Sequence, residues 1–221
     1  AWRRLIFIGL PTSLEFLMMF VIFIVIYYVI RDFGADAQAG FGIGGRIMQS
    51  IFLPAMAVAF AAAPIAGQNF GAKRYERVRE TFNMTALISC GIMLTLSILC
   101  HLMPGLLARP FTDDPAVLAI SNDYLQIVSW NFVFSGLVMA AGSLFQGMGD
   151  TRPSLFASAT RMITFVLPVL WMSSQNWFAL HHVWLISVAS VVSQCAIVIV
   201  LLLRCRRWWQ ALARREMRIT A

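Results

Sequence analysis

Six apolar stretches, each about as long as a membrane-crossing helix, occupy most of this sequence. A helix needs about 20 apolar residues to cross the hydrocarbon core of a bilayer. Because no water is available there to pair backbone N–H and C=O groups, such stretches fold as helices. The sequence therefore predicts an all-α integral membrane protein with six transmembrane helices, at about 5–30, 43–69, 84–103, 124–148, 154–172 and 184–203.

The composition supports this class of protein. Hydrophobic residues make up 60% of the 221 residues and charged residues 12%, whereas soluble domains carry roughly 25% charged residues. The mean hydropathy is +0.77. The connections between stretches are short and leave no room for a soluble domain, so we expect residues 1–221 to form one transmembrane unit.

The positive charges predict the orientation of these helices. Cytoplasmic loops of membrane proteins are enriched in Lys and Arg, and thirteen of the 17 basic residues fall on one side of the predicted membrane. That side is therefore expected to be the cytoplasm, with both termini on it. The bias also explains the net charge of +7, so no nucleic-acid partner is expected, and the bilayer is the expected surroundings. The thirteen residues are Arg3, Arg4, Lys73, Arg74, Arg77, Arg79, Arg152, Arg204, Arg206, Arg207, Arg214, Arg215 and Arg218.

One acidic residue, Glu15, falls inside a predicted helix. It lies about ten residues from the start of the first stretch, roughly 15 Å at 1.5 Å per residue, which places it near the midplane. Ionisable groups at membrane depth are costly and are usually kept for function. A carboxyl there could load and release a proton or bind Na⁺. The alternative is a structural glutamate that is paired or hydrogen-bonded within the bundle.

Four further polar residues are weaker candidates. Arg46 is expected near the outer interface, where a snorkelling side chain is favoured over substrate binding. Arg161 lies deeper, and a structural pair with Asp150 is favoured over a place at the inner mouth. Asn131 belongs to a stretch of the fourth span that offers only neutral polar groups.

Enzymatic function finds no support in the sequence. It contains no HExxH, GxSxG or P-loop motif, and the three histidines lack metal-ligand spacing. We therefore expect a protein that is not an enzyme and has no metal or cofactor beyond a coupling ion.

Two segments at the cytoplasmic ends of helices resemble a known family. Residues 67–71 read Gly-Gln-Asn-Phe-Gly and precede Lys73, so that Gln68 and Asn69 stand where the apolar stretch gives out. Residues 146–153 read Gln-Gly-Met-Gly-Asp-Thr-Arg-Pro. Both are similar to the intracellular loops of the second half of MATE (multidrug and toxic compound extrusion) transporters.

The resemblance implies the C-terminal six-helix lobe of a twelve-helix, two-lobe transporter in the bacterial inner membrane. It implies secondary active multidrug efflux, in which amphipathic cationic compounds leave by alternating access in exchange for H⁺ or Na⁺. The family carries a functional acid on the helix that matches the one bearing Glu15. The implied partner is an N-terminal six-helix lobe or a second copy of this chain. Two alternatives are a lipid-linked saccharide flippase of the same superfamily and a non-transporting membrane subunit or scaffold.

Overall fold

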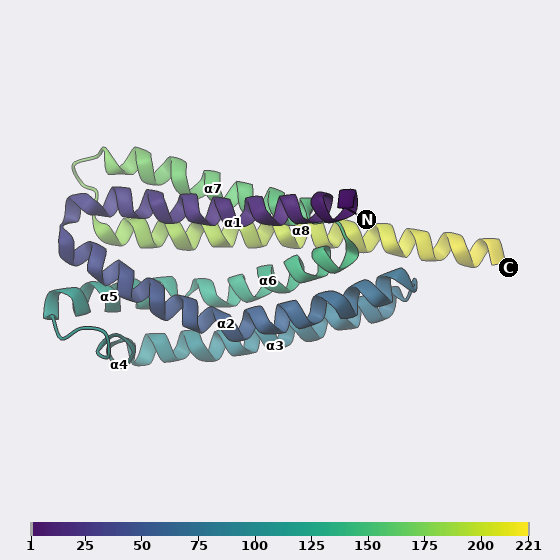
Figure 1. The fold of residues 1–221 in the computed structure, drawn as a ribbon, viewed down its shortest axis with the longest axis horizontal. Helices are drawn as coiled ribbons and strands as arrows, with labels where there is room; N and C mark the ends of the chain where they lie inside the picture. The colour runs from purple at the N-terminus through teal and green to yellow at the C-terminus, as the bar shows by residue number, and fades with distance from the viewer. Residues whose placement is uncertain (1, 221) are drawn as a thin grey trace.

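The computed structural model describes the backbone of residues 2–220, and the side chains of residue 6 and of residues 9–205. The helices follow one another up and down along a single long axis (Figure 1). They are α1 (Trp2–Ile30), the 3-10 helix η1 (Arg31–Phe33), α2 (Ala35–Gly71), α3 (Tyr75–Leu102), α4 (Pro104–Ala108), α5 (Pro115–Val128), α6 (Asn131–Met148), α7 (Arg152–Ser173) and α8 (Leu180–Thr220).

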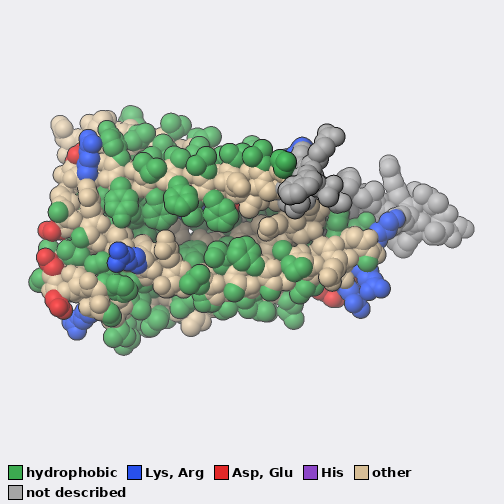
Figure 2. All heavy atoms as spheres, viewed as in Figure 1, with side chains coloured by type: hydrophobic (Ala, Val, Ile, Leu, Met, Phe, Trp, Pro, Cys, Tyr) green, Lys and Arg blue, Asp and Glu red, His purple; other side chains and the backbone are tan. Residues whose placement is uncertain are grey.

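Six of these helices contain segments long and apolar enough to cross a membrane, which confirms the all-α membrane fold. The segments are Gly9–Phe33, Ala35–Gly71, Tyr75–Leu102, Asn131–Met148, Arg152–Ser173 and Leu180–Cys205. In the face shown by Figure 2, apolar side chains cover the length of the molecule and charged side chains gather mostly at its two ends. The predicted cytoplasmic residues Arg3, Arg4, Arg206, Arg207, Arg214, Arg215 and Arg218 lie outside the residues whose side chains are described.

The helices form two groups that α8 joins. In the first group α1 packs against α7, and α7 packs against α8. In the second group α2 packs against α3, α5 and α6. Contacts of α8 with α5 and α6 join the groups. Because α1 and α2 touch each other little beyond η1, they diverge along the face seen in Figure 1.

An aromatic cluster fills the half of the core next to η1. The ring of Phe41 on α2 stacks on Trp184 of α8 with centroids 5.6 Å apart, and Tyr124 of α5 packs edge-on against both. Gly44 lets α2 approach this cluster, since a Cβ there would collide with the Tyr124 ring. Aromatic packing of this kind holds both helix groups together.

At the opposite end, α2 and α6 cross through glycines. A Cβ on Gly67 would lie 2.7 Å from the carbonyl oxygen of Gly147, and a Cβ on Gly147 would collide with the carbonyl oxygen of Ala63. Between membrane helices, small residues allow this close backbone approach. The two loop segments that carry the family resemblance therefore meet in space.

The predicted fourth span, 124–148, needs a correction, because the structure divides it between α5 and α6 at Ser129 and Trp130. The amides of Trp130 and Phe132 bond three residues back instead of four. Two side chains of α3 occupy the break. The Ser97 hydroxyl donates to the Ser129 carbonyl at 2.9 Å, and His101 Nδ1 lies 3.0 Å from Ser129 Oγ. Side chains that enter the helical ladder in this way produce kinks.

Candidate functional site

Glu15 lies on α1 where this helix packs against α7. Its side chain is half-buried, and the hydroxyl of Ser154 donates to Glu15 Oε2 at 3.1 Å. The partner residue is 139 positions away in the sequence. This hydrogen bond comes from a neutral hydroxyl, so it holds the carboxyl in place without adding a counter-charge.

The depth of Glu15 differs from the sequence-based expectation. Ser154 is in the first turn of α7 (Arg152–Ser173), so the carboxyl lies nearer to one end of the bundle than to its middle. The midplane position was predicted on the assumption that all helices of the bundle begin at the same level as the first apolar stretch. The start of α7 instead lies alongside the middle of α1.

Arg161 does not form the expected pair with Asp150. Asp150 Oδ1 accepts a hydrogen bond from the backbone amide of Arg152 at 3.2 Å and so caps the start of α7. Arg161 lies nine residues further along α7, about 13 Å at the helical rise, too far for an ion pair. Its electrostatic neighbour is the phenol of Tyr124, and Arg161 Nε is buried without a hydrogen-bond partner.

Asn131 and Arg46 occupy opposite environments. Asn131 begins α6 and is 3% exposed, and its Oδ1 is buried without a hydrogen-bond partner. Arg46 is exposed on α2, where its backbone carbonyl accepts from Ser50. Arg46 is thus on the helix surface, and both the snorkelling expected of it and a role in substrate binding stay predictions.

The polar residues of the loop motifs have clear structural partners. The Asn69 amide donates to the carbonyl of Ile65 at 2.9 Å, so this side chain secures the last turn of α2. Gln68 is exposed, and it lines one shallow cavity together with Gln146 of α6. Beside them, Gly149 ends α6 in the left-handed region at φ 81°. The two similar motifs thus meet at one shared end of α2 and α6.

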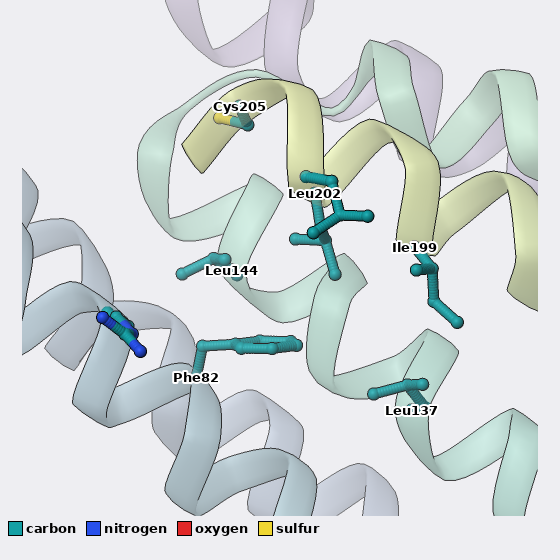
Figure 3. Close-up of a pocket in the computed structure, with 8 residues that line it drawn as sticks. Phe82, Leu137, Leu144, Ile199, Leu202 and Cys205 are labelled. Atoms are coloured by element: carbon teal, nitrogen blue, oxygen red, sulfur yellow. The ribbon is translucent and has the colours of Figure 1, made fainter. Parts of the chain in front are cut away.

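A second cavity, of about 150 Å³, lies between α3, α6 and α8 (Figure 3). Its lining is mostly apolar, with Phe82, Leu144 and Leu202 among the residues that point into it, and it also includes Arg79 and Cys205. It is separate from Glu15, which lies on the α1 and α7 side of the lobe. No described group of three or more His, Cys, Asp or Glu residues could hold a metal ion.

Sequence reasoning missed three residues of this region. Ser154, Tyr124 and Trp184 become relevant only because folding brings α5, α7 and α8 beside α1 and α2. The sequence signal that could have indicated Ser154 is a hydroxyl residue in the first helical turn that follows Asp150. Nothing local distinguishes Tyr124 or Trp184 from other core aromatic residues.

The MatE family model matches residues 11–172. The chain belongs to this family. The match covers α1 to nearly the end of α7, including Glu15, Arg161 and both loop motifs.

Relatives and solved structures agree with the MatE assignment. A probable multidrug resistance protein NorM from Thermotoga maritima is 24% identical over 191 residues, which cover 86% of this chain and 41% of the relative. A probable multidrug resistance protein YpnP from Bacillus subtilis is 28% identical over 146 residues, 63% of this chain and 33% of the relative. An outward-facing multidrug resistance MATE family transporter of the MOP superfamily superposes with a TM-score of 0.82 at 23% identity, covering 94% of this chain and 46% of that chain.

The chain therefore spans less than half the length of these relatives and has the fold of about half of a MATE transporter structure.

Proposed function

We propose that this MatE chain forms one lobe of a secondary active multidrug exporter. The exporter moves amphipathic cationic compounds outward in exchange for H⁺ or Na⁺ by alternating access. The names of the relatives as multidrug resistance proteins support multidrug export. The other lobe is an N-terminal six-helix unit or a second copy of this chain, because a transporter of this kind rocks two bundles about a shared site. The bacterial inner membrane is the proposed location, with both termini in the cytoplasm.

The observation that carries this proposal is the placement of Glu15. Every other acid whose side chain is described is exposed, whereas Glu15 is half-buried within a membrane-spanning segment. Its carboxyl has one hydroxyl partner and no described cation beside it. A group that can change its charge during each cycle is what ion coupling requires. A non-transporting scaffold has no need of such a group.

The test replaces this carboxyl by a neutral amide of nearly equal size. In the complete protein, Glu15→Gln is expected to reduce ion-driven drug exchange at least about tenfold while drug binding remains, because an amide cannot take up or release charge. Exchange is measured in proteoliposomes with an imposed H⁺ or Na⁺ gradient, and binding is measured in detergent.

Two control variants make the result specific. Glu80→Gln removes an exposed acid of α3 and is expected to leave exchange unchanged. Glu15→Asp keeps the charge and is expected to retain part of the activity. Exchange at the wild-type rate in Glu15→Gln would show that the glutamate is structural and that coupling resides elsewhere.

A further inference from the structure

Arg161 is a partly buried cation without a counter-charge among the described residues. It lies on the face of α7 that also carries Ala157 and Phe165, four residues to either side, which are 0% and 1% exposed. This spacing directs the guanidinium into the lobe. No described carboxylate forms an ion pair with it, and Nε has no hydrogen-bond partner. An uncompensated charge of this kind is costly at membrane depth, so an anion is expected beside it in the working protein.

The groups around Arg161 are donors and aromatic rings. The Tyr124 phenol is its electrostatic neighbour, and Tyr27 of α1 is in turn close to Tyr124. Trp184 packs against Tyr124 with ring centroids 4.8 Å apart and is 0% exposed, and its indole N–H also has no partner. One unpaired N–H donor therefore belongs to a residue that packs against Tyr124, and the other belongs to the electrostatic neighbour of Tyr124. This combination suits an anionic group attached to an aromatic body.

Tyr124 and Trp184 are buried, whereas Arg161 is only partly buried and Tyr27 is exposed on the face on which α1 and α2 diverge. Tyr27 is 41% exposed, and its hydroxyl reaches across to α2, where a Cβ on Gly42 would lie 3.4 Å from it. Figure 2 shows this face, which is hollowed between the two helices. A ligand that enters between α1 and α2 can therefore reach the Arg161 side of the lobe.

Glu15 provides a negative charge on the same side of the lobe as the positive charge of Arg161. Its partner Ser154 precedes Arg161 by seven residues on α7, which is two helical turns on the same face and about 10.5 Å along the axis. Among the described residues, no ion pair joins Glu15 and Arg161. A ligand that meets both residues therefore needs a cationic group and an anionic group.

We propose that Arg161 binds the carboxylate of zwitterionic amphipathic substrates, whose cationic group lies toward Glu15. This inference rests on the proposed export function, for which it names a specificity-determining residue. The planar guanidinium offers two parallel N–H donors that match the two carboxylate oxygens. The aromatic residues beside it pack against the apolar body of the ligand.

A pair of dyes that differ in the carboxylate alone tests this assignment. Rhodamine 110 is a zwitterion with a free carboxylate, and rhodamine 123 is its methyl ester. Binding of each dye to the complete protein in detergent is measured by fluorescence anisotropy. Arg161→Gln is expected to weaken rhodamine 110 binding at least about tenfold and rhodamine 123 binding less than about twofold. The matched control Arg109→Gln, which changes an exposed arginine at the far end of the lobe, is expected to alter neither.

The remaining outcomes are equally decisive. If Arg161→Gln fails to assemble, Arg161→Lys gives the same comparison, with an expected loss of about threefold confined to rhodamine 110. Equal losses for both dyes, no loss for either, or no binding of rhodamine 110 to the wild-type protein would overturn the assignment. No loss for either dye is also the result expected if a carboxylate elsewhere in the complete protein neutralises Arg161. Selective rhodamine 110 binding without export of either dye from proteoliposomes would instead refute the export function and leave the anion site standing.

Discussion

The hydrogen bond between Ser154 and Glu15 is a residue-scale feature with a measurable consequence. Ser154→Ala removes the only described donor to the Glu15 carboxyl. Hydrogen bonds to charged groups contribute about 1.5–3 kcal/mol. We expect ion-driven exchange by Ser154→Ala to fall severalfold in proteoliposomes, less than in Glu15→Gln, because the carboxyl remains but is less well positioned.

The double variant distinguishes positioning from general damage to α7. If Ser154 acts through Glu15, adding Ser154→Ala to Glu15→Gln produces little further loss. Thr160→Ala serves as the control on the same helix, since its hydroxyl bonds only to the carbonyl of Phe156 within α7. Additive losses in the double variant would mean that Ser154 contributes independently of Glu15.

At this scale the sequence identified Glu15 as a candidate coupling residue but did not predict which residues surround it. An acid within an apolar stretch is visible without a structure, because its cost in lipid is local. Its partner Ser154 comes from a helix 139 residues away, and only tertiary packing places the two side by side. The predicted ion pair between Arg161 and Asp150 was wrong because Asp150 instead accepts a hydrogen bond from the backbone amide of Arg152 at the start of α7.

The crossing of α2 and α6 yields a prediction at the scale of the elements. Gly147→Ala places a methyl group against the Ala63 carbonyl, so the two helices must separate. Overpacking of this kind costs about 1–3 kcal/mol. We expect the apparent Tm in detergent to fall by several degrees, measured by fluorescence-detected size exclusion after heating.

Gly91→Ala is the matched control. Gly91 lies within α3, and a Cβ there meets nothing within 4 Å. Alanine is favoured over glycine in helices by about 0.5–1 kcal/mol, so this variant is expected to keep or raise the Tm. An unchanged Tm in Gly147→Ala would show that the crossing adjusts without cost and that its small residues do not set the helix spacing.

The elements themselves followed largely from the sequence. Apolar length predicts a membrane helix because the lipid requires internal backbone pairing, whatever the neighbours are. The break at Ser129 and Trp130 escaped prediction because its cause, Ser97 and His101, lies on another helix. The short helix α4 (Pro104–Ala108) lies in a loop between spans, where length and hydropathy give no signal.

The orientation of the whole molecule is tested by labelling. Positions 73 and 175 lie in loops at opposite ends of the bundle, between α2 and α3 and between α7 and α8. The positive-inside rule predicts that position 73 faces the cytoplasm. With the four native cysteines replaced, a single cysteine at 175 should react with an impermeant reagent in intact cells, and one at 73 should react only after lysis. Labelling of position 73 from outside would reverse the orientation.

Transport itself is a property at the scale of the whole assembly. We predict that these 221 residues alone do not export drugs. Alternating access needs two bundles that rock about a site between them, and in this lobe the divergent face of α1 and α2, with Tyr27 and Phe20 exposed, has no bundle opposite within the chain. The measurement is drug efflux from cells that express the chain alone and from cells that also express a separately encoded N-terminal six-helix lobe. Efflux is expected only in the second case.

A homodimer of parallel six-helix units also has suitable symmetry, since both termini are predicted on one side. Full efflux from the lone chain, together with a dimer-sized species in detergent, would therefore replace the two-lobe proposal with a self-sufficient dimer.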